Sequence, residues 1–101
     1  MDLKLAGQSV LITGASQGIG SGLAQAFAEE GVNVHLTARS ADRLEELKRA
    51  IVEDHDVEVE LHPLDLTEQG ACERLAEAVG DVDILVNNAG VIPSGTLAEI
   101  D

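Results

Sequence analysis

Apolar residues follow two alternating patterns along the chain. Four short runs, some unbroken and some alternating with polar residues, have the composition of β-strands, and the first stops at a glycine as a strand buried on both faces does. Between these runs, apolar residues recur every three or four positions, which is the period of a helix. The predicted strands cover residues 9–14, 32–38, 57–62 and 83–87.

Three helices are predicted between the strands. In the first, which begins at Gly18 and ends before Gly31, the residues at helical spacing are Ile19, Leu23, Ala26 and Phe27. Ser40 is expected to cap the second helix, whose apolar face consists of Leu44, Leu47 and Ile51. Thr67 is expected to cap the third, which ends at Gly80 and whose apolar face consists of Cys72, Leu75 and Val79.

The alternation of strands and helices predicts an α/β fold. Strands joined by helices pair in parallel through right-handed crossovers, with helices on both faces of the sheet, so the predicted fold is doubly wound. Glu58 and Glu60 alternate with apolar residues, which indicates a half-exposed edge strand. The run at 83–87 looks buried and requires a fifth strand beside it. We therefore expect residues 1–101 to be the N-terminal part of a single domain whose sheet is incomplete in this sequence.

A glycine-rich turn separates the first predicted strand from the first helix. Residues 13–20 read Thr-Gly-Ala-Ser-Gln-Gly-Ile-Gly. Glycines allow a sharp turn and a close approach of the backbone to a ligand, and the free N–H groups at the start of the helix favour a phosphate. Such a turn can also serve only as a connection, but its position between a strand and a helix favours nucleotide binding.

Three motifs occur in order along the chain. The turn reads T-G-x-x-x-G-I-G, Asp65 and Leu66 come just after the third predicted strand, and N-N-A-G occupies residues 87–90. Together they resemble the classical short-chain dehydrogenase/reductase family. The resemblance implies a Rossmann-like fold and an NAD(P)-dependent oxidoreductase that interconverts a carbonyl and an alcohol by hydride transfer. Two alternatives stay open: a catalytically inactive NADP(H)-binding or regulatory module, and an extended-type member such as a sugar-nucleotide epimerase, whose usual spacing is T-G-x-x-G-x-x-G.

The resemblance also assigns cofactor contacts. It implies that the residues of the glycine turn lie against the phosphates, that Asp65 accepts a hydrogen bond from the adenine amino group, and that residues 88–90 pass beneath the ribose. The alternative for Asp65 is a strand-end or capping aspartate, and Asn87 is expected to tie the fourth strand to its neighbours. With two residues that follow the second strand, the expected cofactor-binding residues are Gly14, Ser16, Gln17, Gly18, Ile19, Gly20, Arg39, Ser40, Asp65, Leu66, Asn88, Ala89 and Gly90.

The end of the second predicted strand indicates which dinucleotide is bound. An acidic residue at this place, roughly 20 residues after the glycine turn, binds the ribose 2′-hydroxyl of NAD. The position holds Ala38, followed by Arg39, whose planar guanidinium suits a 2′-phosphate, and by Ser40. NADP(H) is therefore favoured over NAD(H), although Gln17 occupies a place that is basic in many NADP-preferring members of the family. The alternative for Arg39 is a solvated arginine at the start of a helix.

Composition and charge exclude several partners. The formal net charge of −13 and a single aromatic residue, Phe27, argue against nucleic acid. Residues 5–28 carry no charge but hold too many glycines and polar residues for a membrane span, so a soluble, cytoplasmic protein is expected. Cys72 is the only cysteine, which fits a reducing compartment, and the three histidines lack the spacing of a zinc site.

The catalytic groups of the family are expected to lie elsewhere. The resemblance places a tyrosine and a lysine in a Y-x-x-x-K motif after the fifth strand, but this sequence has no tyrosine, and neither Lys4 nor Lys48 lies at a fitting place. We therefore expect no catalytic residue in this chain, which supplies the cofactor-binding half and is inactive alone. The full-length form is expected to be a homo-oligomer that acts on a small carbonyl or alcohol.

Overall fold

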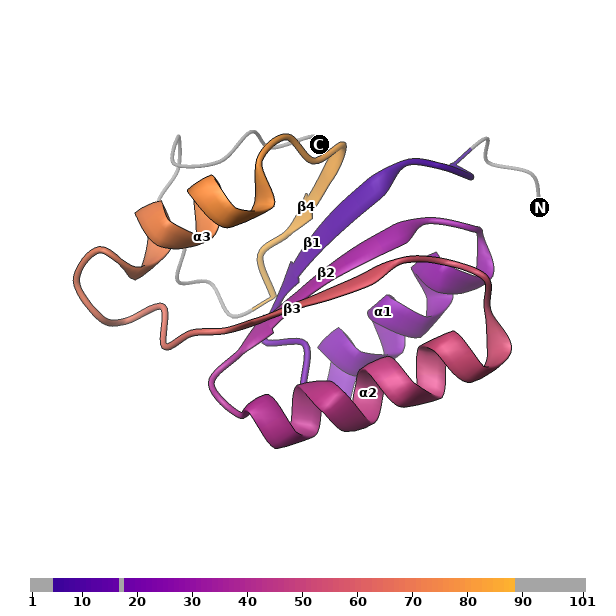
Figure 1. Ribbon diagram of the computed structural model, residues 1–101, viewed down its shortest axis with the longest axis horizontal. Helices are drawn as coiled ribbons and strands as arrows, with labels where there is room; N and C mark the ends of the chain where they lie inside the picture. Colours follow the sequence, from indigo (N-terminus) through magenta and orange to yellow (C-terminus); the bar gives the residue numbers. More distant parts are fainter. Residues whose placement is uncertain (1–4, 17, 89–101) are drawn as a thin grey trace.

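The computed structural model describes residues 5–16 and 18–88, which form an α/β unit (Figure 1). Its sheet is entirely parallel and has the strand order β3-β2-β1-β4. The strands are β1 (Ser9–Thr13), β2 (Asn33–Ala38), β3 (Val59–Pro63) and β4 (Ile84–Val86). The helices between them are α1 (Gly18–Glu29), α2 (Ala41–Asp54) and α3 (Ala71–Val79). The predicted α/β fold and its parallel pairing are confirmed.

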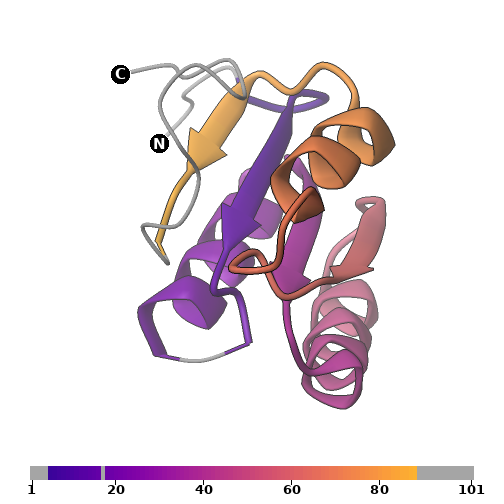
Figure 2. The ribbon, with the colours of Figure 1, turned by 90° about the vertical axis from the view of Figure 1, so that its left-hand side faces the viewer.

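The helices cover both faces of the sheet, as predicted for a doubly wound fold. Helices α1 and α2 lie on one face and α3 lies on the other (Figures 1 and 2). Side chains of β1 alternate between the two layers: Val10 and Ile12 pack in the core with α1 and α2, whereas Leu11 packs with α3. All three are fully buried, which agrees with the unbroken apolar run at residues 10–12 of the sequence.

The packing of α1 differs from the face that the apolar spacing indicated. Ile19 is 74% exposed and Ala26 is also exposed, while Leu23 and Phe27 are only partly buried. The buried residues of α1 are the smallest ones, Gly20, Ala24 and Ala28. Small side chains let the helix backbone lie close to the sheet, so the large apolar residues are displaced to the flanks of the contact.

Of the two predicted N-caps, Ser40 for α2 and Thr67 for α3, one is confirmed. The Arg43 backbone N–H donates to Ser40 Oγ over 3.2 Å, which confirms Ser40 as the N-cap of α2. The prediction for α3 is wrong, because its N-cap is Gly70, in a left-handed conformation with φ of 81°. Thr67 instead donates its N–H and its hydroxyl to the Asp65 carboxylate, a local pairing that competes with a capping role. The predicted apolar faces of both helices are buried.

The positions of β3 and β4 in the described sheet can be compared with those predicted from the sequence. Strand β3 is an edge strand, as Glu58 and Glu60 indicated. Strand β4 lies at the other end of the described sheet, and its three residues are half-buried. A fifth strand beside it would fall outside the described residues and stays a prediction. Within the described part of the chain, none of the helices has the length and apolar character needed to cross a membrane.

Candidate functional site

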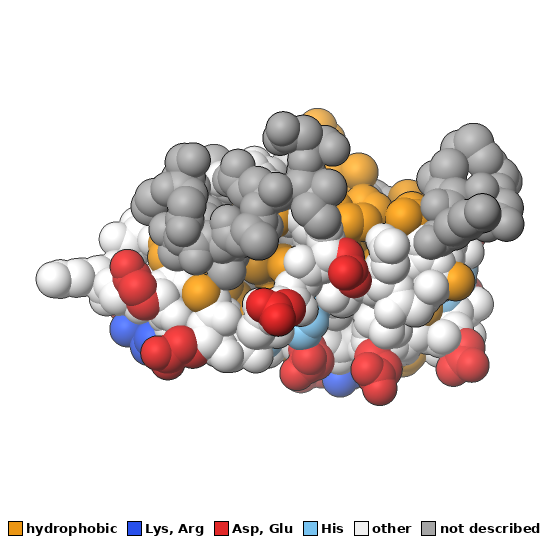
Figure 3. All heavy atoms as spheres, turned by 90° about the horizontal axis from the view of Figure 1, so that it is seen from above, with side chains coloured by type: hydrophobic (Ala, Val, Ile, Leu, Met, Phe, Trp, Pro, Cys, Tyr) orange, Lys and Arg blue, Asp and Glu red, His pale blue; other side chains and the backbone are white. Residues whose placement is uncertain are grey.

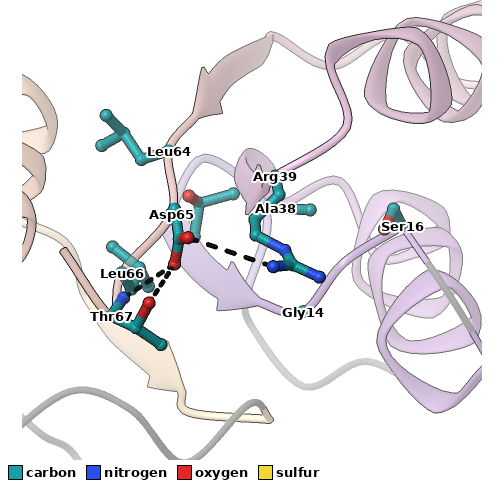
Figure 4. Close-up of a pocket in the computed structure, with 9 residues that line it drawn as sticks. Gly14, Ser16, Ala38, Arg39, Leu64, Asp65, Leu66 and Thr67 are labelled. Atoms are coloured by element: carbon teal, nitrogen blue, oxygen red, sulfur yellow. Dashed lines mark hydrogen bonds and ion pairs between the residues drawn. The ribbon is translucent and has the colours of Figure 1, made fainter.

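A cleft opens where three neighbouring parallel strands end. Figure 4 shows that it is framed by the segments that follow β1, β2 and β3. In open parallel sheets, ligands bind at the carboxyl ends of the strands, where loops diverge from the sheet. The cleft measures about 230 Å³, slightly below the range of complete small-molecule pockets, so it holds one part of a ligand. It is lined by Gly14, Ser16, Thr37, Ala38, Arg39, Leu64, Asp65, Leu66 and Thr67.

The glycine turn brings the start of α1 against the end of β1. Gly14 and Gly18 adopt positive φ angles of 62° and 46°, which residues with side chains rarely adopt. A Cβ on Gly20 would collide with the carbonyl oxygen of Gly14 and would lie 2.9 Å from Asn88 Nδ2. The turn thus leaves no space for a side chain at Gly20, and it lies beside the start of α1, where free backbone N–H groups favour an anion.

Two asparagines connect the end of β4 to this turn. Asn88 Nδ2 donates to the carbonyl oxygen of Gly14 over 3.3 Å. The buried Thr13 hydroxyl donates to Asn87 Oδ1 over 3.3 Å and lies 3.5 Å from the carbonyl oxygen of Val86. Asn87 therefore ties β4 to β1, as the sequence predicted, while Asn88 braces the turn itself.

Asp65 and Arg39 form the polar rim of the cleft. Their side chains point toward one another in Figure 4, with Arg39 Nη1 4.0 Å from Asp65 Oδ2. The other carboxylate oxygen, Oδ1, accepts hydrogen bonds from the Thr67 hydroxyl at 2.6 Å and the Thr67 N–H at 3.0 Å. These bonds, the hydroxyl first, together with a smaller effect of Arg39, lower the pKa of Asp65. Asp65 is thus an ionised acceptor with Oδ2 turned toward the cleft rim.

A second hollow adjoins the cleft beyond Arg39. It is lined by Ser16, Arg39, Ser40 and Arg43. The guanidinium side chain of Arg39 is 81% exposed, so it is free to turn toward a ligand at little cost. The hollow also lies at the amino end of α2, where backbone N–H groups carry partial positive charge. None of the described residues that line it is a carboxylate, which makes it suited to an anionic group.

Comparisons with known proteins fit this geometry. A sequence model of the family described as short chain dehydrogenase matches residues 8–101. The chain belongs to the short-chain dehydrogenase family. An uncharacterized oxidoreductase of Staphylococcus saprophyticus is 36% identical over 103 residues, which cover 98% of this chain and 44% of that relative.

Solved structures of short-chain dehydrogenases have the same fold. L-sorbose reductase from Gluconobacter frateurii, complexed with NADPH and L-sorbose, is 39% identical and superimposes with a TM-score of 0.83 over 87% of this chain and 35% of its own. A metagenomic short-chain oxidoreductase in complex with NADP is 40% identical, with a TM-score of 0.78 over 83% of this chain and 39% of its own. The chain spans less than half the length of these proteins, and its sheet is Rossmann-like as expected.

Most of the cofactor-binding residues expected from the short-chain dehydrogenase motifs lie close together, at the carboxyl ends of the strands. Six of them line the cleft or the adjoining hollow, namely Gly14, Ser16, Arg39, Ser40, Asp65 and Leu66. Gly18, Ile19 and Gly20 form the first turn of α1, and Asn88 contacts Gly14. Gln17, Ala89 and Gly90 lie outside the described residues. Their roles toward a cofactor, like those of the other residues, are part of the proposal below.

Two features of this short-chain dehydrogenase were not predicted from its sequence. Arg43 lines the second hollow, and its position three residues after the cap Ser40 could have indicated this from helical spacing alone. The second feature is a pair of stacked histidines, with His35 Nδ1 3.1 Å from His62 Nε2 and 3.4 Å from Glu60 Oε2. No sequence motif links these histidines, because they meet only through the pairing of β2 with β3.

Proposed function

We propose that the protein is an NADP(H)-dependent oxidoreductase of short-chain type that interconverts a carbonyl and an alcohol, and that this chain provides its dinucleotide-binding part. The observation that carries the proposal is the site at the end of β2. Ala38 stands where an acidic residue would bind the ribose of NAD, and Arg39 and Ser40 follow it in a hollow that no described carboxylate lines. The bound NADPH and NADP in the two solved relatives support this choice of cofactor.

The residues of the cleft fit the parts of such a dinucleotide. Leu64, Leu66 and Ala38 provide apolar walls for the planar adenine, and Asp65 provides a carboxylate acceptor for its amino group. The pyrophosphate would lie over the glycine turn, beside the start of α1, which the missing side chain of Gly20 allows to pack closely against Gly14. The nicotinamide of the bound cofactor supplies the hydride.

Arg39 discriminates between the two dinucleotides in this proposal. Its guanidinium would bind the 2′-phosphate of NADP(H) through charge-assisted hydrogen bonds, which are each worth about 1.5–3 kcal/mol. Such a contact corresponds to roughly a tenfold to hundredfold preference for NADPH over NADH. The Ser40 hydroxyl lines the same hollow and would add a neutral contact.

Proton transfer to the substrate falls to residues outside this sequence, which contains no tyrosine. Binding of the nucleotide by this chain is therefore separable from turnover, and the chain alone is expected to be inactive. The cytoplasmic location and the homo-oligomeric state expected from the sequence belong to the same proposal.

Titration of the nucleotide-free, intact protein with NADPH and with NADH tests the cofactor. We expect tighter binding of NADPH, and we expect Arg39→Gln to remove most of that preference while leaving the affinity for NADH unchanged. Equal affinities of the unmodified protein for both nucleotides would contradict the role of Arg39. A protein that binds NADPH but oxidises no alcohol and reduces no ketone would instead support the regulatory module considered above.

A further inference from the structure

We propose that His35 and His62 form a binding site for Zn²⁺ or a similar divalent transition-metal ion, and that Glu60 completes its ligand set. The inference does not rest on the proposed function, because no part of it involves the dinucleotide. The donor atoms are one imidazole nitrogen from each histidine and a carboxylate oxygen, a combination that Zn²⁺ binds in proteins.

The pairing of β2 with β3 places the three side chains on one face of the sheet. In the register of these strands, His35 is paired with Glu60 and Leu36 with Leu61. Side chains alternate between the two faces of a strand. Leu36 and Leu61 pack in the core with α1 and α2, so His35, Glu60 and His62 point to the opposite face. Among the described residues, the apolar cluster of α3 on that face takes no side chain from β2 or β3, which leaves this part of the sheet polar.

The distances between the donor atoms are close to those of ligands around one ion. His35 Nδ1 lies 3.1 Å from His62 Nε2 and 3.4 Å from Glu60 Oε2. Ligand atoms that a tetrahedral zinc ion holds at about 2.0–2.1 Å lie roughly 3.3–3.4 Å from one another. A small rotation of the two rings therefore admits an ion between the facing nitrogens.

The hydrogen bond between the histidines is compatible with metal binding. Imidazole coordinates a metal ion in its neutral form, and each neutral ring carries one N–H group. In the neutral pair, one of the two facing nitrogens donates its proton to the other. To bind the ion, the donating ring holds this proton on its other nitrogen instead. Both facing nitrogens then present a lone pair, and no proton is lost from the pair.

The histidines are the preformed part of the site. No three of the described side chains are already gathered into a metal centre, so Glu60 has to turn toward the ion. The Glu60 side chain is 64% exposed and turns at little cost, whereas the His35 side chain is 12% exposed and held by its surroundings. Two nitrogens, one carboxylate oxygen and a water molecule make the four ligands of a zinc ion. Mg²⁺ prefers oxygen ligands and is not expected to bind.

Calorimetric titration of the intact, tag-free protein with Zn²⁺ tests the site, and Mg²⁺ is the control ion. We expect His62→Gln to weaken Zn²⁺ binding by more than about tenfold, since loss of even a residue that supports a ligand costs roughly 10–100-fold. Glu60→Gln should weaken it less, because both histidines remain. His55→Gln is the matched control and should change nothing, since His55 lies after α2 and outside the pair.

Nitrogen NMR identifies the ligand atoms without a substitution, so the inference stays testable if a variant does not fold. Zn²⁺ is expected to shift the signals of His35 Nδ1 and His62 Nε2 and to raise the urea midpoint, because it binds the folded protein. A protein that binds no zinc, zinc binding that His62→Gln leaves unchanged, or zinc that leaves both signals in place would each overturn the inference. None of these results bears on the titrations with NADPH and NADH, so the proposed function stands or fails separately.

Discussion

Gly20 determines how closely α1 can lie against the glycine turn. In Gly20→Ala the new methyl group would meet the carbonyl oxygen of Gly14, which belongs to the backbone and cannot rotate away, and the amide of Asn88. We expect the helix to shift and the free energy of unfolding to fall by about 1–3 kcal/mol. The measurement is urea unfolding of the variant, followed by titration with NADPH, whose binding is expected to weaken as well.

Gly22 provides the matched control for this prediction. It lies on the same helix, a methyl group added to it would have nothing within 4 Å, and it has no positive φ. Gly22→Ala is expected to stabilise the protein by about 0.5–1 kcal/mol, because alanine loses less backbone entropy in a helix. The two substitutions should therefore have opposite signs. A neutral or stabilising Gly20→Ala would show that the close approach is not needed.

The histidine pair makes the stability of the sheet depend on pH. Burial lowers the pKa of His62, and the neighbouring His35 lowers it further, while Glu60 acts in the opposite direction. The unfolded chain, with a histidine pKa near 6.5, therefore binds this proton more readily than the folded chain. The contribution of the neutral His62 to the free energy of unfolding is therefore fully present above about pH 6.5. It is lost as the pH falls through that value toward the lower pKa of the folded state.

Urea midpoints measured between about pH 7.5 and 5.5 test this dependence, in a range above the titration of ordinary carboxylates. His62→Gln is expected to reduce the loss of stability on acidification. His55→Gln serves as the control, since His55 lies after α2 and outside the stacked pair. An identical pH dependence of His62→Gln and the unmodified protein would contradict a role of the pair.

At the scale of a single element, Ser40 couples the stability of α2 to the phosphate hollow. Ser40→Ala removes the cap and is expected to cost about 1 kcal/mol of unfolding free energy. Ser40→Asp retains a capping oxygen but places a carboxylate in the hollow, so it should unfold like the unmodified protein and bind NADPH less tightly. If Ser40→Asp bound NADPH normally, the hollow would not be the site of the 2′-phosphate.

The seven elements were largely predictable because their signals are local. Apolar runs and helical spacing located every strand to within two residues, and the cap of α2 was visible in Ser40 and the residues that follow. The start of α3 was not predictable in this way, because Thr67 pairs with Asp65 before a helix can use it. The buried side of α1 was not predictable for another reason, since close packing selects the smallest residues of the helix and the apolar spacing marks the largest.

At the scale of the whole molecule, the features that the sequence did not indicate are those made by distant segments. The pairing of β2 with β3 places Thr37 beside His62, whose carbonyl oxygen accepts the Thr37 hydroxyl at 2.6 Å, and brings His35 against the His62 ring. The motifs located the cleft because each follows a strand of the same parallel sheet. The spacing of Arg43 from Ser40 indicates that these two residues lie together, but that both line one hollow with Ser16 depends on how α2 lies beside the glycine turn.

Net charge acts on the molecule as a whole. The chain carries a formal charge of −13 within a longest dimension of 38 Å, and acidic side chains follow one border of the face shown in Figure 3 with few basic ones among them. Repulsion within the folded chain therefore opposes folding. At about 0.01 M salt the screening length is about 30 Å and charges repel across most of the molecule, whereas at about 0.15 M it is about 8 Å.

Added sodium chloride is thus expected to stabilise this 101-residue chain. The salt also weakens the ion pair of Arg39 with Asp65, but a pair with an exposed arginine contributes little, so the loss of repulsion dominates. We expect the melting temperature to rise by several degrees between about 0.01 and 0.15 M, since about 1 kcal/mol corresponds to roughly 4–8 °C in a chain of this size.

A double variant tests the same effect without salt. Glu53→Gln with Glu77→Gln removes two exposed charges near the carboxyl ends of α2 and α3. It should raise the melting temperature at low salt and reduce the response to salt. A melting temperature that falls with salt would mean that specific ion pairs, and not the net charge, control stability.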